Sequence, residues 1–314
     1  IEELVSRADI PSWRDYLEWH LLRTASPHLP APFVSENFDF FGRTMTGAKE
    51  LRPRWKRCVE LTDRQMGEAL GKKYVDKAFP GEAKQKMLAL VENVQSALEE
   101  DIRQLDWMTE ETRARAIEKL SAIRNKIGYP EQWRDYSTLT VRRDDPVGNV
   151  FRANRFEFLR DVKKIGHEVD PMEWSMTPPT VNAYYSPLMN NINFPAGILQ
   201  PPFYDPKIDE AVNYGGIGAV IGHELSHGFD DQGRKFSGSG NLEDWWTEKD
   251  AKAFEERAAC IDQQYAGYTA IGDLKLNGKL TLGENVADNG GLRLAYMALQ
   301  KAWEKNPAAA KEGF

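Results

Sequence analysis

The chain of 314 residues is long enough to form two packed domains. Its formal net charge is −7, whereas a nucleic-acid or anionic-membrane binder needs a basic excess. Hydrophobic residues make up 41% and charged residues 28%, which supports folded cores and excludes global disorder. No apolar run approaches the length of a membrane span. We therefore expect no nucleic-acid partner and no membrane contact from this segment.

The first half of the chain predicts one helix after another. Apolar residues recur at helical spacing over residues 51–78 and again over residues 82–108. Thr109 is placed to cap a third helix, with two acidic residues in its first turn. This third helix is expected to stop near Gly128, where a Gly-Tyr-Pro sequence breaks the pattern.

The pattern changes to β near residue 178. Residues 180–185 alternate and are rich in β-formers, and a polar turn separates them from residues 192–194. Pro195 follows and is typical of an edge strand, so we expect a short hairpin with an exposed edge. Helical patterns return over residues 208–229, from Trp246 onward and over residues 283–304.

A domain boundary is expected where this change occurs. The sequence Pro178-Pro179 marks it, and we place the boundary near residue 177. The prediction is a mostly helical cap or N-terminal region over residues 1–177 and a catalytic domain over residues 178–314.

The motif His223-Glu224-Leu225-Ser226-His227 carries the strongest chemical signal. Residues four apart lie on the same face of a helix, so both imidazoles can bind one zinc ion. Glu224 then lies close enough to act as general base on a zinc-bound water. The alternative is a pair of buried structural histidines on a core helix. Motif and helical context together favour the zinc site.

A catalytic zinc needs a third protein ligand and one open position. The extended pattern HExxHxxGxxH is not met, because Asp230 and Gly233 stand at its glycine and last histidine. Glu284 is the better candidate. Asp288 shares its helix face and could accept the second N–H of a zinc-bound histidine. The alternatives are a capping box from Thr281 to Glu284 and a solvated charge at Asp288.

Small residues favour a close approach between the two helices that carry these groups. The face of the histidines continues back to Val220 and Gly216, and the face of Glu284 continues to Gly291 and Ala295. Without large side chains between them, the two helix axes can come together. This packing favours Glu284 as the third ligand over the capping box.

The expected hairpin offers a binding surface for an extended peptide. An edge strand over residues 181–185 presents backbone donors and acceptors, and the Asn182 amide can both donate and accept. Ile198, Phe203 and Val220 could line an apolar pocket for one substrate side chain. The alternatives are an ordinary edge strand and plain core residues.

Several longer segments resemble one known family, the neprilysin/endothelin-converting-enzyme family of zinc metalloendopeptidases (gluzincins). They are NAYYSP at 182–187, FPAGILQPPF at 194–203, NYGGIGAVIGHELSHGFDDQGR at 213–234, LEDWW at 242–246 and TLGENVADNGGL at 281–292. The resemblance continues in the first half with WKRC at 55–58, LDWM at 105–108 and IGYP at 127–130. It therefore covers nearly the whole chain.

The resemblance implies a fold and a set of roles. The fold is mainly α with a small β hairpin or sheet (α+β), in which a thermolysin-like catalytic domain packs against a helical cap. An enclosed cavity would admit oligopeptides. The implied roles are one Zn2+ per chain bound by His223, His227 and Glu284, with Glu224 as base, Asp288 as support and proton donor, and Asn182 and Ala183 as the clamp on the substrate backbone.

Members of this family are considerably longer than this chain. We therefore expect N- and C-terminal segments of the same protein as partners, the latter supplying a histidine and an arginine that stabilise the oxyanion and hold the substrate. Cys58 and Cys260 match positions that bond to outside segments in disulfide-containing relatives, so they are not expected to pair with each other. Buried free thiols are the alternative. Disulfides would imply an extracytoplasmic location: secreted, periplasmic or the ectodomain of an anchored protein.

The expected function is that of a zinc-dependent endopeptidase acting on oligopeptides. One alternative is a catalytically silent, zinc-containing peptide-binding fragment that lacks the terminal transition-state residues. A second is a helical scaffold protein with a chance HExxH sequence and no metal. A third is a different metal-dependent hydrolase.

Overall fold

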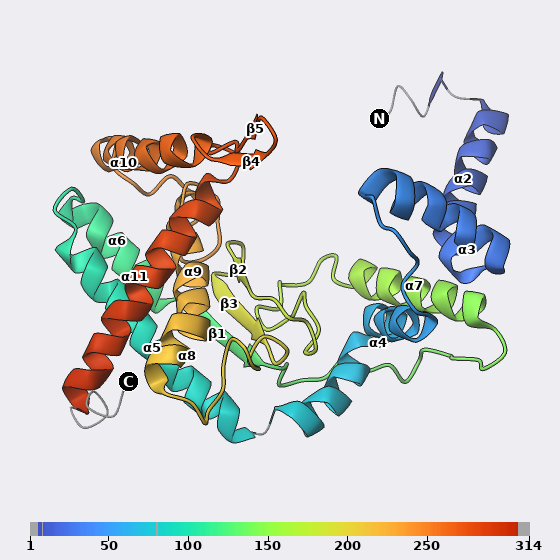
Figure 1. Ribbon diagram of the computed structural model, residues 1–314, viewed down its shortest axis with the longest axis horizontal. Helices are drawn as coiled ribbons and strands as arrows, with labels where there is room; N and C mark the ends of the chain where they lie inside the picture. Colours follow the sequence, from blue (N-terminus) through green and yellow to red (C-terminus); the bar gives the residue numbers. More distant parts are fainter. Residues whose placement is uncertain (1–5, 8, 80, 307–314) are drawn as a thin grey trace. The chain divides into compact units, whose positions relative to one another are not determined.

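The computed structural model describes residues 6–7, 9–79 and 81–306 (Figure 1). Contacts divide the chain into two compact units. The first unit holds the residues up to Leu70 together with Arg134–Val169, and the second unit holds Gly71–Trp133 and the residues from Asp170 onward. The expected separation into a cap over residues 1–177 and a catalytic domain over residues 178–314 stays a prediction.

The first unit is helical. Its elements are α2 (Ile10–Ala25), η1 (Ser26–His28), α3 (Ala31–Asn37), η2 (Phe38–Thr44), the first part of α4 (Arg54–Ala78) and α7 (Pro146–Val162). Asp9 caps α2 by accepting from the Ser12 N–H, and Asp145 caps α7 by accepting from the Gly148 N–H. The predicted helix over residues 51–78 is confirmed as α4, with a kink at Met66.

The second unit combines helices with two small sheets. Its helices are α5 (Gly81–Gln104), α6 (Glu110–Ser121), α8 (Glu210–Asn213), the π-helical turn η3 (Tyr214–Gly218), α9 (Ala219–His227), η4 (Gly233–Lys235), α10 (Glu248–Ala266) and α11 (Leu282–Lys305). Its strands are β1 (Arg124–Gly128), β2 (Tyr184–Ser186), β3 (Asn191–Pro195), β4 (Thr269–Ile271) and β5 (Leu274–Lys275). Thr109 caps α6 as predicted, and Thr247 caps α10.

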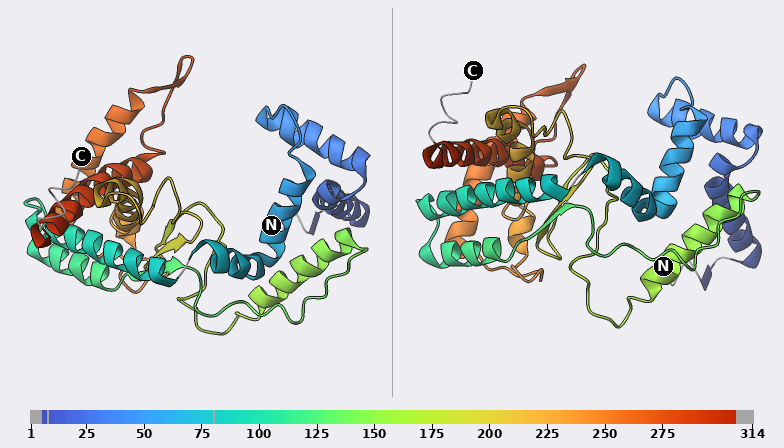
Figure 2. Two further views of the ribbon diagram at one scale, coloured as in Figure 1. Left: turned by 60° about the horizontal axis from the view of Figure 1, so that its bottom comes forward. Right: turned by 90° about the horizontal axis from the view of Figure 1, so that it is seen from below.

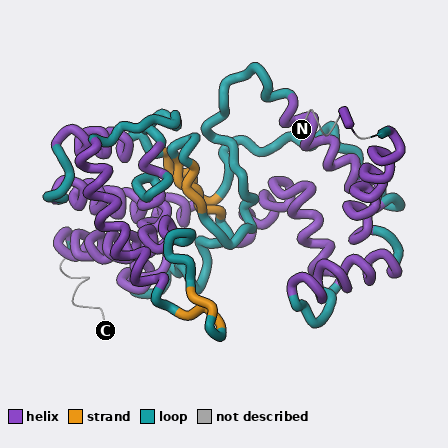
Figure 3. Tube along the Cα trace, turned by 90° about the horizontal axis from the view of Figure 1, so that it is seen from above, coloured by secondary structure: helices purple, strands orange, loops and turns teal. Residues whose placement is uncertain are grey.

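The larger sheet has the strand order β1-β3-β2 and lies beside the helices of the second unit (Figure 3). The predicted hairpin is confirmed, since β2 and β3 pair antiparallel. Two expectations were wrong. The first is the helix expected to continue to Gly128: it ends at Ser121, and Arg124–Gly128 forms a strand parallel to β3. The second is the assignment of Pro195 to an edge strand: β3 is the central strand, and Pro195 is its last residue, where the missing N–H costs no internal ladder bond.

The core of the second unit lies between α5, the sheet and the two helices α9 and α11. Fully buried apolar side chains come from all of them; they include Met87, Val91, Val94, Ile127, Ile192, Phe194, Ile217, Ile221, Leu225 and Leu294. Each α9 or α11 residue of this set points away from the polar face of its helix. This packing fixes both helices in rotation as well as in position.

Helix α11 crosses α9 with direct backbone contact (Figure 2). A Cβ added at Gly222 would lie 2.8 Å from the Gly291 Cα, and one added at Gly291 would lie 2.6 Å from the His223 backbone nitrogen. Only glycine allows this separation at either position. The close approach expected from small residues is therefore present, and it places the first turns of α11 against the histidine face of α9.

Candidate metal centre

The three residues predicted as metal ligands on α9 and α11 lie together. The Nε2 atoms of His223 and His227 are 2.9 Å apart. The Glu284 Oε2 atom lies 3.4 Å from the His223 Nε2 and 3.7 Å from the His227 Nε2. Among the residues that the structure describes, this trio is the group of three with converging metal-ligand atoms.

Two aspartates fix the tautomer of the histidines. The Nδ1 of His223 lies 2.8 Å from Asp288 Oδ1, and the Nδ1 of His227 lies 2.7 Å from Asp230 Oδ2. A carboxylate only accepts, so each Nδ1 carries the proton and donates it. Both Nε2 atoms then present lone pairs toward Glu284. This arrangement is the outer shell that metal-binding histidines use.

The donor set fits a zinc ion. Two imidazole lone pairs and one carboxylate oxygen face each other at 2.9–3.7 Å, and they repel one another unless a cation lies between them. Tetrahedral zinc with ligands at 2.0–2.2 Å has neighbouring donor atoms about 3.3 Å apart.

Asp230 was missed as a partner of His227. It is 4% exposed and lies three residues beyond the histidine, in the turn that follows α9. Burial lowers the pKa of His227, but the hydrogen bond and charge of Asp230, with the charges of Glu224 and Glu284, outweigh this effect and raise it overall. In the sequence Asp230 stands out only as a departure from the HExxHxxGxxH pattern, although an acid near a ligand histidine is a signal in itself.

Glu224 is buried beside the trio, with 6% of its surface exposed. Burial raises the pKa of its carboxyl group to about 7, against the charge of His227 and the backbone N–H of Tyr185, which lower it. Glu284 also acts to raise this pKa. A carboxyl group with such a pKa exchanges its proton near neutrality, which is the requirement for a general base.

A cavity of about 450 Å³ borders these residues. It is lined on one side by the helix residues His223, Glu224, His227 and Glu284, and on the other by residues 182–185 and Pro187. The expected strand over residues 181–185 begins only at Tyr184, so Asn182 and Ala183 precede it. The Ala183 N–H donates to the Asn182 side-chain oxygen at 2.9 Å, which orders this corner of the cavity.

The three residues expected to form an apolar pocket do not line this cavity. Ile198 is buried in the hydrophobic core, and Phe203 and Val220 pack against that core. The plain-core alternative describes their surroundings, and a substrate pocket at these positions stays a prediction. The capping box considered for Glu284 is wrong, because the Thr281 side chain makes no cap bond and instead accepts from the Asn285 amide.

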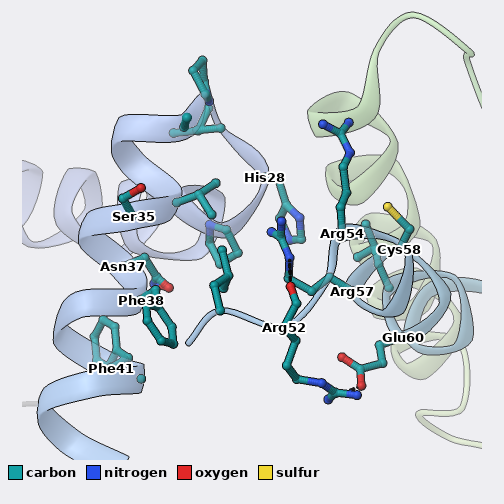
Figure 4. Close-up of a pocket in the computed structure, with 18 of the residues that line it drawn as sticks. His28, Ser35, Asn37, Phe38, Phe41, Arg52, Arg54, Arg57, Cys58 and Glu60 are labelled. Carbon is teal, nitrogen blue, oxygen red and sulfur yellow. Dashed lines mark hydrogen bonds and ion pairs between the residues drawn. The ribbon is translucent and has the colours of Figure 1, made fainter. Parts of the chain in front are cut away.

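A larger cavity of about 760 Å³ lies within the first unit (Figure 4). Its lining includes His28 together with Arg52, Arg54, Arg57 and Arg64. Arg52 pairs with Glu60, and the Arg57 Nε donates to the Arg52 carbonyl at 3.1 Å. None of the residues predicted to act in catalysis belongs to this cavity.

Cys58 and Cys260 are both exposed and unpaired. The alternative of buried thiols is therefore wrong. None of the described helices has the length and hydropathy that crossing a membrane requires.

Known proteins resemble the chain over nearly its whole length. Two models of Peptidase family M13 match it, the N-terminal model over residues 1–130 and the second over residues 182–313. Endothelin-converting enzyme 1 of Mus musculus is 40% identical over 98% of this chain and 41% of its own length. Neprilysin-11 of Caenorhabditis elegans is 38% identical over 98% of this chain and 37% of its own length.

A solved structure shows the same fold. The zinc metalloprotease Zmp1 of Mycobacterium tuberculosis, in complex with an inhibitor, matches with a TM-score of 0.91 and 49% identity, over 97% of this chain and 47% of that chain. The chain belongs to peptidase family M13. It spans less than half the length of the relatives it matches.

Proposed function

We propose that this chain carries the zinc-binding part of an endopeptidase that hydrolyses peptide bonds in oligopeptides. The observation that carries the proposal is the convergence of the Nε2 atoms of His223 and His227 and one Glu284 oxygen next to the buried Glu224. Membership of peptidase family M13 and the likeness to a zinc metalloprotease support it.

His223, His227 and Glu284 would hold one Zn2+, with Asp288 and Asp230 orienting the two imidazoles. A bound zinc ion supplies Lewis acidity at the scissile carbonyl and acidifies a water molecule. The carboxylate of Glu224 would take the proton of that water, hold it in a buried position, and deliver it to the leaving amine. The further role of Asp288 as a proton donor, which the family resemblance implies, stays a proposal, and its carboxylate contacts the Nδ1 of His223.

Asn182 and Ala183 would hold the peptide backbone of the substrate. Both line the cavity opposite the histidines, and Asn182 is exposed. Its amide can donate to a substrate carbonyl and accept from a substrate N–H.

The test is the variant Glu224→Gln in the full chain. We expect zinc content to stay at one per chain and peptide hydrolysis to fall by about 10²–10⁴-fold, because an amide cannot accept the proton. Glu92→Gln, at an exposed position on α5, is the matched control and should leave both unchanged. Undiminished hydrolysis by Glu224→Gln would refute the assigned base.

A silent peptide-binding fragment is the second candidate function. It is favoured by the share of endothelin-converting enzyme 1 that this chain matches, which is 41% of that protein's length. Loss of one oxyanion donor costs about 10²–10³ in rate. One bound zinc per chain with no cleavage of a fluorogenic peptide by the unaltered chain would favour this candidate.

We also propose an extracytoplasmic location, secreted, periplasmic or in the ectodomain of an anchored protein. It is supported by Cys58 and Cys260, whose exposed thiols can bond to segments outside this chain. Non-reducing peptide mapping of the parent protein checks this: both cysteines should appear in disulfides, and free thiols at both positions would contradict it.

A further inference from the structure

A buried lysine holds the segment that follows α9. Lys119 lies on α6 with 2% of its surface exposed. Its ammonium group donates to three backbone carbonyls: Gly228 at 2.6 Å, Gly233 at 2.7 Å and Phe236 at 2.7 Å. A lysine has three N–H donors, so these three acceptors use all of them. The segment 228–236 is therefore tied to α6 at its beginning, middle and end.

The same segment carries the carboxylate that orients His227. Asp230 Oδ1 accepts from the backbone N–H groups of Gln232 and Gly233 at 2.9 and 2.7 Å, while its Oδ2 accepts from His227. The segment turns back tightly against α9, because a Cβ at Gly233 would lie 1.7 Å from the His227 carbonyl oxygen. The position of the Asp230 carboxylate is thus set by the segment and not by its own rotamer alone.

Three aromatic rings surround the buried Lys119 ammonium group. The rings of Tyr185, Phe229 and Trp245 lie 5.5–5.9 Å from its Nζ atom. Trp245 also donates to the Phe236 carbonyl at 3.0 Å, so this oxygen has two donors. Charge-assisted hydrogen bonds of a buried group are stronger than those at the surface. The segment consequently has little freedom to move relative to α6.

The network also reaches the strand beside the cavity. The Asn190 amide donates to the Lys119 backbone carbonyl and to the Gly238 carbonyl, both at 3.1 Å. The Tyr185 hydroxyl donates to the Asn190 side-chain oxygen at 2.9 Å. Tyr185 belongs to β2, and the backbone N–H of Tyr185 faces Glu224. Helix α6 therefore supports both walls of the proposed site.

A second buried lysine provides a comparison within the same unit. Lys126 on β1 is 3% exposed and lies 5.3 Å from the Trp174 ring. Its ammonium group donates to the Glu173 carbonyl at 2.5 Å. Among the described residues, no hydrogen bond joins it to the segment 228–236 or to the three predicted metal ligands. The two lysines thus share burial and an aromatic neighbour but differ in what they hold.

We propose that Lys119 is a positioning residue of the metal centre, which sets the orientation of the His227 imidazole through the segment 228–236 and Asp230. This inference rests on the proposed zinc site. It assigns to α6, far from the HExxH motif in sequence, a part in metal binding. Lys119 does not touch the metal or the substrate and acts only through the carbonyls it holds.

The test compares zinc affinities of variants of the full chain, measured by competition with a chelator. Lys119→Met should weaken zinc binding about 10-fold or more, as the loss of an outer-shell partner does. Lys126→Met removes a buried ammonium group of the same kind and should change zinc affinity less than about 2-fold, although both variants lower the melting temperature. Asp230→Asn should weaken zinc binding at least as much as Lys119→Met.

A double-variant cycle tests whether Lys119 acts through Asp230. Adding Lys119→Met to the Asp230→Asn variant should lower zinc affinity much less than Lys119→Met does alone. The reason is that Asp230→Asn has already removed the carboxylate through which Lys119 orients His227. Cobalt(II) substitution gives a readout of geometry: the visible absorption bands should shift in Lys119→Met and stay in place in Lys126→Met.

The outcomes separate the inference from the proposed function. If the unaltered chain binds no zinc, the proposed site fails. If it binds one zinc and Lys119→Met binds it equally well with unchanged cobalt bands, only the inference is overturned. If Lys119→Met does not fold, the zinc affinity of Lys119→Arg is measured instead, because a planar guanidinium cannot direct three donors to these three carbonyls. Several-fold weaker zinc binding by Lys119→Arg than by the unaltered chain supports the inference, and equal affinity overturns it.

Discussion

His28 in the first unit and His227 in the second unit are both half-buried imidazoles beside a cavity, and the charges around them are opposite. Burial lowers the pKa of His28, and Arg64 and Arg57 lower it further. Burial also lowers the pKa of His227, but Asp230, Glu224 and Glu284 together outweigh it and the pKa is raised. The same residue type therefore meets a cationic neighbourhood in one unit and an anionic one in the other.

The difference shows that cavity size does not identify a cation site. The cavity at His28 is the larger of the two, at about 760 Å³ against about 450 Å³. Its arginines would repel a divalent cation, whereas the carboxylates around His227 attract one. What defines the site on α9 is the convergence of lone pairs on fixed helices.

Replacing one ligand histidine gives the largest expected effect. His227→Ala should reduce bound zinc from one per chain to a trace, because only two ligands remain. His28→Ala removes an imidazole from the arginine-lined cavity and should leave zinc content unchanged. Metal analysis after dialysis measures both variants. Equal zinc loss in the two variants would break the distinction between the cavities.

Removing the charge of Glu284 should have the next largest effect. Glu284→Gln keeps the size of the side chain but weakens its oxygen as a ligand, so zinc affinity should fall by about 100-fold or more. Chelator competition measures this change. An unaltered zinc affinity would show that the third ligand lies elsewhere.

The contact between α9 and α11 can be tested without touching a ligand. Gly291→Ala adds a Cβ that would lie 2.5 Å from the Ala219 carbonyl oxygen, so the helices must separate. We expect a loss of about 2 kcal/mol in the free energy of unfolding and weaker zinc binding. At Gly81 an added Cβ meets nothing within 4 Å, so Gly81→Ala should change neither quantity. Unchanged stability in Gly291→Ala would contradict the close crossing.

Proton titration of the metal-free chain gives the smallest effect and sharpens the comparison of the two histidines. Because the pKa of His227 is raised from 6.5 and that of His28 is lowered, His227 should keep its proton to a higher pH than His28 does. Since zinc requires neutral imidazoles, its affinity should fall as the pH drops through the pKa of His227. NMR of the imidazole protons measures the two titrations, and the reverse order would contradict the charges assigned here.

Most helices were predictable from the sequence because each pattern is local. The spacing of apolar residues in α5 and the capping residues Thr109 and Thr247 lie within a few positions of the elements they define. Strand β1 was not predictable in this way. Its residues Arg124–Gly128 pair with Asn191–Pro195, and such a distant parallel pairing leaves no short-range pattern.

The candidate site divides in the same manner. His223 and His227 share one motif, and Glu284 and Asp288 share one helix face, so the sequence could bring out both pairs. The glycine at position 291 also indicated that α9 and α11 pack closely. The contribution of Lys119 could not be foreseen, since it depends on α6 packing against a segment more than a hundred residues away. Ile198 was assigned to a pocket because apolar type alone does not separate core from cavity lining.

The most direct test of the account is a structure of the zinc-loaded chain determined with data collected at the zinc absorption edge. The account predicts one anomalous peak per chain, within about 2.0–2.2 Å of the Nε2 atoms of His223 and His227 and of a Glu284 oxygen. A zinc peak coordinated by other residues, or none in a chain saturated with the metal, would contradict it.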